Sequence, residues 1–175
     1  GTESAIVSIF GETESIFLSS RTTGNSSVAI PNNAIEALEI LNEAGAAETE
    51  NSSSVLLTAS SGVNDTIDTV TVTAPTDGFV LVIATAEVSV NHINASVTSA
   101  NFGVSSTTSL PVNGDIELRI DDDMPTGTYD YPVTVQAIFP ASAGSNTYYF
   151  VGDQNTTTGD FFALDRQVSA IFVPT

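Results

Sequence analysis

The sequence contains no cysteine, no tryptophan and no apolar run long enough to cross a membrane. The lack of cysteine excludes disulfides, thiolate metal sites and cysteine nucleophiles. A protein without disulfides must obtain its stability from packing, from assembly or from bound ions. Because a transmembrane helix needs about 18 or more consecutive apolar residues, we expect no membrane insertion. The 175 residues fit one domain, and the 41% hydrophobic content is enough for a folded core.

Positive charge is also scarce. The chain has no lysine and three arginines against 21 acidic residues, so its formal net charge at pH 7 is −18. Nucleic acid is disfavoured as a partner, because a binding protein needs a basic surface to displace counterions from phosphate. Anionic membranes are disfavoured for the same reason. Cations are the natural partners of such a surface, although the charge can also serve only to keep an exposed protein soluble.

The uncharged polar residues are mainly serine, threonine and asparagine, which is typical of the β-rich surface of an extracellular protein. Asn-X-Ser/Thr triplets would be glycosylation acceptors in a secretory pathway, although they also arise by chance in a chain of this composition. These triplets begin at Asn25, Asn51, Asn64, Asn94 and Asn155. We expect a secreted or cell-surface protein.

From residue 53 onwards, short apolar or alternating segments are separated by turn signals such as "PTDG", "NGD" and "SAGSN". In "PTDG", which reads as a turn, Pro75 fixes φ and Gly78 can supply a positive φ. The next segment, "FVLVIATAEVSV", begins with a continuous apolar run, which predicts a strand covered on both faces. The last two strands are expected at "FFALD" and "QVSAIFVPT". The whole pattern predicts an all-β fold, an antiparallel jelly-roll sandwich.

One short helix is expected before the strands. Ile35, Leu38 and Leu41 recur every three residues, and Gly45 is a plausible stop. These signals predict one short N-terminal helix around residues 33–43. We therefore divide the chain into an extended or helical N-terminal segment or stem, residues 1–50, and a jelly-roll domain, residues 51–175.

The last two thirds of the chain resemble a known family. A "GFVLV" strand follows "APTDG", the segment "PTGTYDYPVTVQAIFPASAGSNTYYFVG" comes later, and the chain closes on "DRQVSAIFVPT". This pattern, over roughly residues 55–175, resembles the jelly-roll heads of the complement C-one-q/tumour necrosis factor superfamily, in particular their bacterial extracellular members. The resemblance implies a compact homotrimer that serves in recognition and assembly rather than catalysis. It also implies that calcium can be bound near the threefold axis.

Aromatic residues near the end of the chain are candidates for a subunit interface. They offer more apolar surface than one modest sandwich needs, and aromatic clusters often become buried at subunit contacts. The alternative is that all of them lie in the core of one subunit. The residues are Tyr148, Tyr149, Phe150, Phe161 and Phe162.

Two groups of acidic residues are candidate metal ligands. Asp121, Asp122 and Asp123 follow the segment "DIELRI", and calcium prefers carboxylate and carbonyl oxygens. A solvated turn, partly neutralised by Arg119, is the competing interpretation, because adjacent residues of a strand point to opposite faces. A weaker candidate is Asp153 with Asp160, which flank the "QNTTTG" loop. Calcium is the one cofactor that we expect.

The sequence offers little for catalysis. His92 is the sole histidine, and the "GxSxG" pattern of a serine hydrolase is absent. A general base must be held by an acid next to a nucleophile, whereas a surface or inter-strand histidine needs no such partners. The chain also lacks the tryptophan platforms common in carbohydrate enzymes. We expect that the protein is not an enzyme.

The N-terminal residues suggest a second mode of assembly. Residues 4–18 could form a strand that completes the sheet of a neighbouring copy, as in fibres built by strand addition. The apolar positions of this strand would be Ile6, Phe10, Ile16 and Leu18. An ordinary first hairpin and a trimer stem are the alternatives. We thus expect a self-assembling trimeric head with a structural or binding function, or else a subunit of an extracellular filament or tube. A head that binds a surface glycan or protein is a third interpretation.

Overall fold

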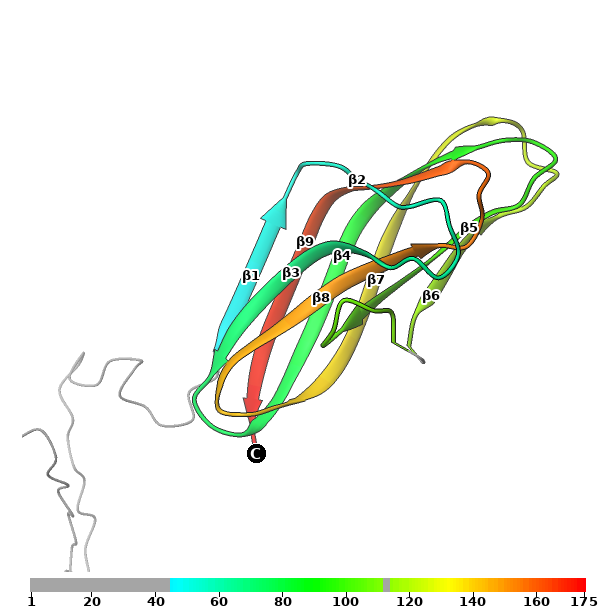
Figure 1. Ribbon diagram of the computed structural model, residues 1–175. Coiled ribbons are helices and arrows are strands. Elements are labelled where there is room, and N and C mark those ends of the chain that lie inside the picture. Colours follow the sequence, from blue (N-terminus) through cyan, green and yellow to red (C-terminus); the bar gives the residue numbers. More distant parts are fainter. Residues whose placement is uncertain (1–44, 112–113) are drawn as a thin grey trace, which may run out of the picture. The chain divides into compact units, whose positions relative to one another are not determined.

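The computed structural model describes residues 45–111 and 114–175, and these residues form strands, turns and loops without a helix (Figure 1). The all-β prediction is therefore confirmed for this part of the chain. The helix expected around residues 33–43 lies outside the described residues. So does the strand-exchange segment, with Ile6, Phe10, Ile16 and Leu18.

Nine strands make up the described part. They are β1 (Ala46–Asn51), β2 (Val55–Leu56), β3 (Asp65–Ala74), β4 (Gly78–His92), β5 (Thr98–Ser105), β6 (Ile116–Ile120), β7 (Gly127–Ala141), β8 (Gly144–Gln154) and β9 (Asp160–Pro174). The boundary that we expected at residue 50 falls inside β1. The segments "FFALD" and "QVSAIFVPT" are parts of one strand, β9, rather than two. A bulge at Asp165, whose φ is 41°, joins them, and the register with β4 shifts there.

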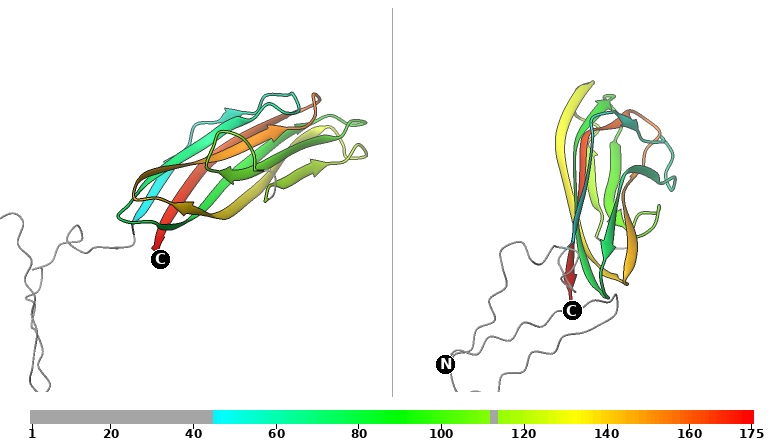
Figure 2. Two further views of the ribbon diagram at one scale, coloured as in Figure 1. Left: turned by 60° about the horizontal axis from the view of Figure 1, so that its bottom comes forward. Right: turned by 90° about the vertical axis from the view of Figure 1, so that its left-hand side faces the viewer.

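The strands form two antiparallel sheets that pack face to face (Figure 2). Sheet A has the order β1-β9-β4-β7, and β2 also pairs with β9. Sheet B has the order β3-β8-β5-β6. Only two successive pairs, β1–β2 and β5–β6, stay within one sheet; every other connection crosses from one sheet to the other.

Alternation along the strands decides which side chains enter the core. In β4, Val80, Val82, Ala84, Ala86, Val88 and Val90 point between the sheets and are buried. The side chains of Phe102, Phe150 and Phe161 meet in the same layer, with ring centroids 6.3 Å apart for Phe102 to each of the other two. Burying one such side chain stabilises a fold by about 1.5–3 kcal/mol. The core therefore comes from the period-two pattern of both sheets.

The other face of β4 is not covered within one chain. The continuous apolar run predicted coverage on both faces, but Phe79 is 45% exposed and Leu81 and Ile83 are half-buried. These three residues face away from sheet B, on what we call the outer face of sheet A. A fully buried strand reads as a continuous apolar run because both of its faces are covered. The second face of β4 is thus partly exposed at its start within the described residues.

Close packing, not a positive φ, explains Gly78. Its φ is not among the positive values, which we find instead at glycines such as Gly144 (106°). A Cβ on Gly78 would lie 2.5 Å from the carbonyl oxygen of Val173 and 2.7 Å from the ring of Phe172. Our expectation for Gly78 was therefore wrong. The turn that precedes it is held by Asp77, whose Oδ1 accepts a hydrogen bond from the backbone N–H of Ala143 (3.0 Å).

Candidate functional site

The outer face of sheet A carries a cluster of exposed apolar side chains near one end. Phe79 pairs with Val173, and Leu81 pairs with both Ile138 and Ile171, so these five residues are neighbours on three adjacent strands. We call them the apolar patch. Ile138 is 68% exposed, Val173 50%, Phe79 45% and Ile171 42%. Exposed apolar patches on folded proteins often mark interaction sites.

The patch has a hollow into which another side chain could fit. A surface hollow of about 310 Å³ is lined by Phe79, Leu81, Ile138 and Val173. Because no polar residue lines it, the hollow would favour an apolar side chain over a charged or sugar-like group. The candidate site is therefore built to bury apolar surface.

Further along the strands, the same face is acidic. A second hollow, of about 520 Å³, is lined by Glu87 on β4, Asp130 on β7 and Asp165 at the bulge of β9, together with Thr85, Ala86, Tyr131 and Pro132. Among these lining residues there is no basic side chain. The outer face of sheet A thus changes from apolar to anionic along its strands.

The three aspartates singled out from the sequence lie in an exposed turn between β6 and β7. Asp121 Oδ1 accepts a hydrogen bond from Arg119 Nε at 2.8 Å. This hydrogen bond and the charge of Asp121 raise the pKa of the Arg119 guanidinium. The backbone carbonyls of Asp121 and Asp122 accept hydrogen bonds from the N–H groups of Met124 and Ala95. The backbone of the turn is therefore held by local contacts, while Asp123 is exposed.

The second acidic pair is divided between two surroundings. Asp153, on β8, is 9% exposed, and its two carboxylate oxygens accept the backbone N–H of Gly62 at 3.1 and 3.0 Å. Asp160 is exposed at the start of β9 and pairs with Asn91. Within residues 45–111 and 114–175, no three His, Cys, Asp or Glu side chains are arranged to hold a metal ion. Asp153 instead fixes the loop before β3.

The aromatic residues are divided between the core and the surface. Tyr148, Phe150 and Phe161 are buried between the sheets, and Tyr148 stacks on Phe139 with ring centroids 5.0 Å apart. Burial raises the pKa of the Tyr148 hydroxyl. Tyr149 and Phe162 are half-buried and point outward, from sheet B and sheet A respectively. Of the five candidates, only these two have surface available to a partner.

His92 is buried, being 1% exposed, at the end of β4. Its Nε2 lies 3.2 Å from the carbonyl oxygen of Met124, and its Nδ1 lies 3.0 Å from Thr98 Oγ1. Because a carbonyl only accepts, Nε2 must carry a proton to bond Met124, and Nδ1 shares a hydrogen bond with the Thr98 hydroxyl. The imidazole therefore connects β4, β5 and the turn that contains Met124. The acid that a catalytic triad requires is not one of its hydrogen-bond partners.

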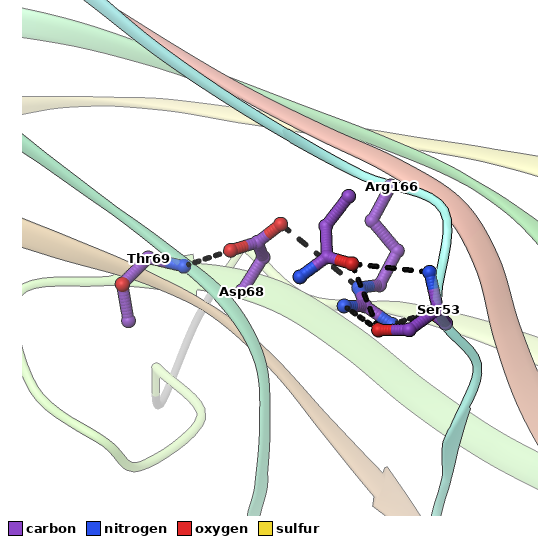
Figure 3. Close-up of polar contacts among 5 residues, drawn as sticks. Ser53, Asp68, Thr69 and Arg166 are labelled. Atoms are coloured by element: carbon purple, nitrogen blue, oxygen red, sulfur yellow. Dashed lines mark hydrogen bonds and ion pairs between the residues drawn. The ribbon is translucent and has the colours of Figure 1, made fainter.

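A buried ion pair joins the two sheets, and we did not anticipate it from the sequence (Figure 3). Arg166 Nε, on β9, lies 3.9 Å from Asp68 Oδ2, on β3, and the two side chains are 3% and 8% exposed. The guanidinium also donates to the backbone oxygen of Ser53, and Asp68 Oδ1 accepts the N–H of Thr69 at 2.8 Å. The signal available in the sequence was the scarcity of arginine, which makes each one a candidate for a specific role.

Comparison with known proteins does not identify this chain: no family model matches it, and no curated protein is similar to it. In the described part of the chain, no helix could cross a membrane. The case for a function therefore depends on the geometry above.

Proposed function

We propose that this chain is an extracellular structural or binding protein that assembles with itself, and that its folded part is a jelly-roll head. The observation that carries the proposal is the apolar patch on the outer face of sheet A. Burying each of its large side chains would contribute about 1.5–3 kcal/mol. A second copy of this chain is the partner that we assign to the patch.

The strand order supports the jelly-roll assignment. When β1 and β2 are taken as one interrupted strand, both sheets have four strands, as in an eight-stranded jelly roll. The first and last strands of the described part lie side by side in sheet A, and the chain alternates between the sheets. The same order is consistent with the resemblance to complement C-one-q/tumour necrosis factor heads.

A homotrimer is the assembly that this resemblance favours. In a closed ring, each copy uses the same contact, and the apolar patch is then covered on every copy. The parts of the head outside this contact would recognise a surface glycan or another protein. Calcium is the cofactor that we propose, held where the turns with Asp121–Asp123 of several copies meet, because repulsion between their carboxylates would favour a bound cation.

An extracellular filament or tube is the second candidate. It is favoured by one observation, which is an unprotected strand edge on sheet B, described in the next subsection. Strand addition at such an edge is a head-to-tail contact, which need not close into a ring. Both candidates require self-association, so one experiment tests what they share.

The test is the mass of the full chain in solution, measured by light scattering coupled to size exclusion, with calcium and with chelator. The wild type should elute as a trimer or larger species. Ile138→Asp should weaken association on the order of 100-fold, because it places a charge in the buried centre of the contact. Its melting temperature should stay near the wild-type value, since Ile138 is exposed in one chain.

The matched control is Ser145→Asp, which adds the same charge on an exposed position of sheet B. This variant should assemble like the wild type. A wild type that is monomeric at high concentration in both buffers would overturn the proposal. An assembly that forms in calcium and dissociates in chelator would support the ion site, whereas equal assembly in both would exclude a structural role for calcium.

A further inference from the structure

Sheet edges are where another strand can add, and most edges of this fold are protected. Edge strands leave unpaired N–H and C=O groups, which proteins guard with prolines, charges or short strands. The edge strand β7 contains Pro132 and Pro140. The edge strand β6 has five residues and contains Glu117 and Arg119. The remaining edge of sheet A is divided between two separate strands, β1 and β2.

The edge formed by β3 is different. From Thr69 to Ala74 it has no proline and no charged residue, and no described strand pairs with its outer side. Val70, Val72 and Ala74 point into the core, whereas Thr71 and Thr73 are exposed on the outer face. We call Thr69–Ala74 the open edge. It is a regular stretch that begins just after the bulge between Thr66 and Asp68.

The direction of the backbone groups can be read from Thr69. Its N–H donates to the Asp68 side chain (2.8 Å), from which we infer that this N–H faces away from β8. Because alternate residues of a strand direct their backbone groups to the same side, Thr71 and Thr73 also face the edge. The N–H groups of Thr71 and Thr73 and the C=O of Thr71 are thus available to an added strand, whereas Gly45 lies against the backbone oxygen of Thr73.

The preceding part of the chain enters the fold beside this edge. A Cβ on Gly45 would lie 3.2 Å from the backbone oxygen of Thr73. Gly45 also accepts a hydrogen bond from the N–H of Phe172 (2.8 Å), which fixes where the chain enters. The described part of the chain therefore begins, at Gly45, beside one end of the open edge.

We propose that the open edge of β3 accepts residues 4–18 of a second copy as an added strand. This inference rests on the proposed self-assembly and names one of its contacts. Residues 5–10, "AIVSIF", carry no charge in a chain of net charge −18, so charge repulsion is smallest there.

The added strand would extend sheet B by one strand. Main-chain hydrogen bonds to Thr71 and Thr73 would provide affinity, and the apolar side chains at alternate positions, such as Ile6 and Phe10, would provide specificity. The contact is head-to-tail, because the donor segment and the acceptor edge are different surfaces. Copies joined in this way form a chain unless the geometry closes a ring.

A photo-crosslinking experiment on the full chain tests the contact without assuming a register. The photo-crosslinking residue p-benzoylphenylalanine replaces Phe10, and the variant protein is irradiated. The crosslinked products are then separated by mass, and the linked residues are identified by peptide sequencing. The expected product is a crosslinked dimer linked within residues 65–74. Thr71→Pro in the same chain should reduce this product at least tenfold, because proline removes an edge-facing donor. The matched control is Gln136→Pro, at an edge position that shares its side with Pro132 and Pro140, and it should leave the product unchanged.

Several outcomes would overturn the inference. These are a crosslink within one chain, a dimer linked to β7 or to the apolar patch, and a yield unaffected by Thr71→Pro. If Thr71→Pro does not fold, amide hydrogen exchange of the wild-type protein tests the contact instead. The amides of Thr71 and Thr73 should be protected from exchange at high protein concentration and should lose this protection on dilution. Exchange rates that do not depend on concentration would refute the contact. Oligomers that persist by light scattering without the crosslink would refute this contact but leave the proposed self-assembly standing.

Discussion

Arg166 is buried, whereas Arg119, the other arginine in the described residues, is exposed. A buried charge that loses its partner is costly, whereas an exposed pair contributes little. The pair of Arg166 with Asp68 is imperfect, because Arg166 Nε and Asp68 Oδ2 are both buried without a hydrogen bond. Its role is to hold the loop with Ser53 and to join the two sheets at one place.

Arg166→Met should therefore destabilise the fold by about 3–5 kcal/mol, since it leaves the Asp68 carboxylate buried and uncompensated. Urea unfolding followed by circular dichroism measures the change. Arg119→Met is the matched control and should leave the midpoint nearly unchanged, because Arg119 and its partner Asp121 are both exposed. The double variant Asp68→Leu/Arg166→Met should recover much of the loss. If it is no more stable than the single variant, the ion-pair explanation is wrong.

For individual residues, the sequence predicted the kind of local structure in which a side chain lies better than it predicted which distant residue that side chain contacts. It identified Asp121–Asp123 as lying in a turn next to Arg119, because the turn signals and the arginine are close in sequence. It could not identify the partner of Asp153, which is the N–H of Gly62, since that contact spans distant parts of the chain. The proposed roles of these carboxylates in calcium binding stay predictions.

At the scale of elements, β4 is the organising strand, because it pairs with both β7 and β9 along its length. Its start is packed so closely that Gly78 has no room for a side chain. The prediction of apolar strands was sound because period-two alternation depends on local sequence. The bulge at Asp165 was missed, since it depends on the register with β4.

Gly78→Ala should destabilise the protein by about 1–3 kcal/mol, because the new methyl group would overlap the backbone of Val173 and force the strands apart. Thermal unfolding measures this effect. The matched control is Gly127→Ala at the start of β7, where a Cβ would meet its nearest neighbour at 3.7 Å, an ordinary contact. Equal losses in the two variants would show that close packing at Gly78 is not the reason for glycine there.

At the scale of the whole molecule, the excess of negative charge opposes both compaction and assembly. A net charge of −18 over 175 residues produces repulsion within one chain and between copies. The acidic hollow with Glu87, Asp130 and Asp165 lies on the same face as the apolar patch. In the self-assembly that we propose, an approaching copy would meet both attraction and repulsion on this face. Because salt screens charge repulsion, the strength of this association should depend on salt concentration.

We expect the assembly to strengthen as salt rises from about 0.01 M to about 0.15 M, because the screening length falls from about 30 Å to about 8 Å. The melting temperature should rise over the same range. Light scattering and thermal melting in sodium chloride measure both effects. Assembly that weakens with salt would instead point to attractive ion pairs across the contact, and would argue against the apolar patch as its centre.

The sequence by itself determined the all-β class of the described residues and the alternation that fills the core, because both depend on local periodicity and composition. It also determined the scarcity of positive charge, from which we predict that nucleic acid and anionic membranes are not partners. Only the tertiary structure decided that the second face of β4 is exposed, because a continuous apolar run looks the same whether its own chain or another copy covers it. The pairing of strands likewise decided that β3 has an open edge, since contacts between distant segments depend on how the whole chain folds.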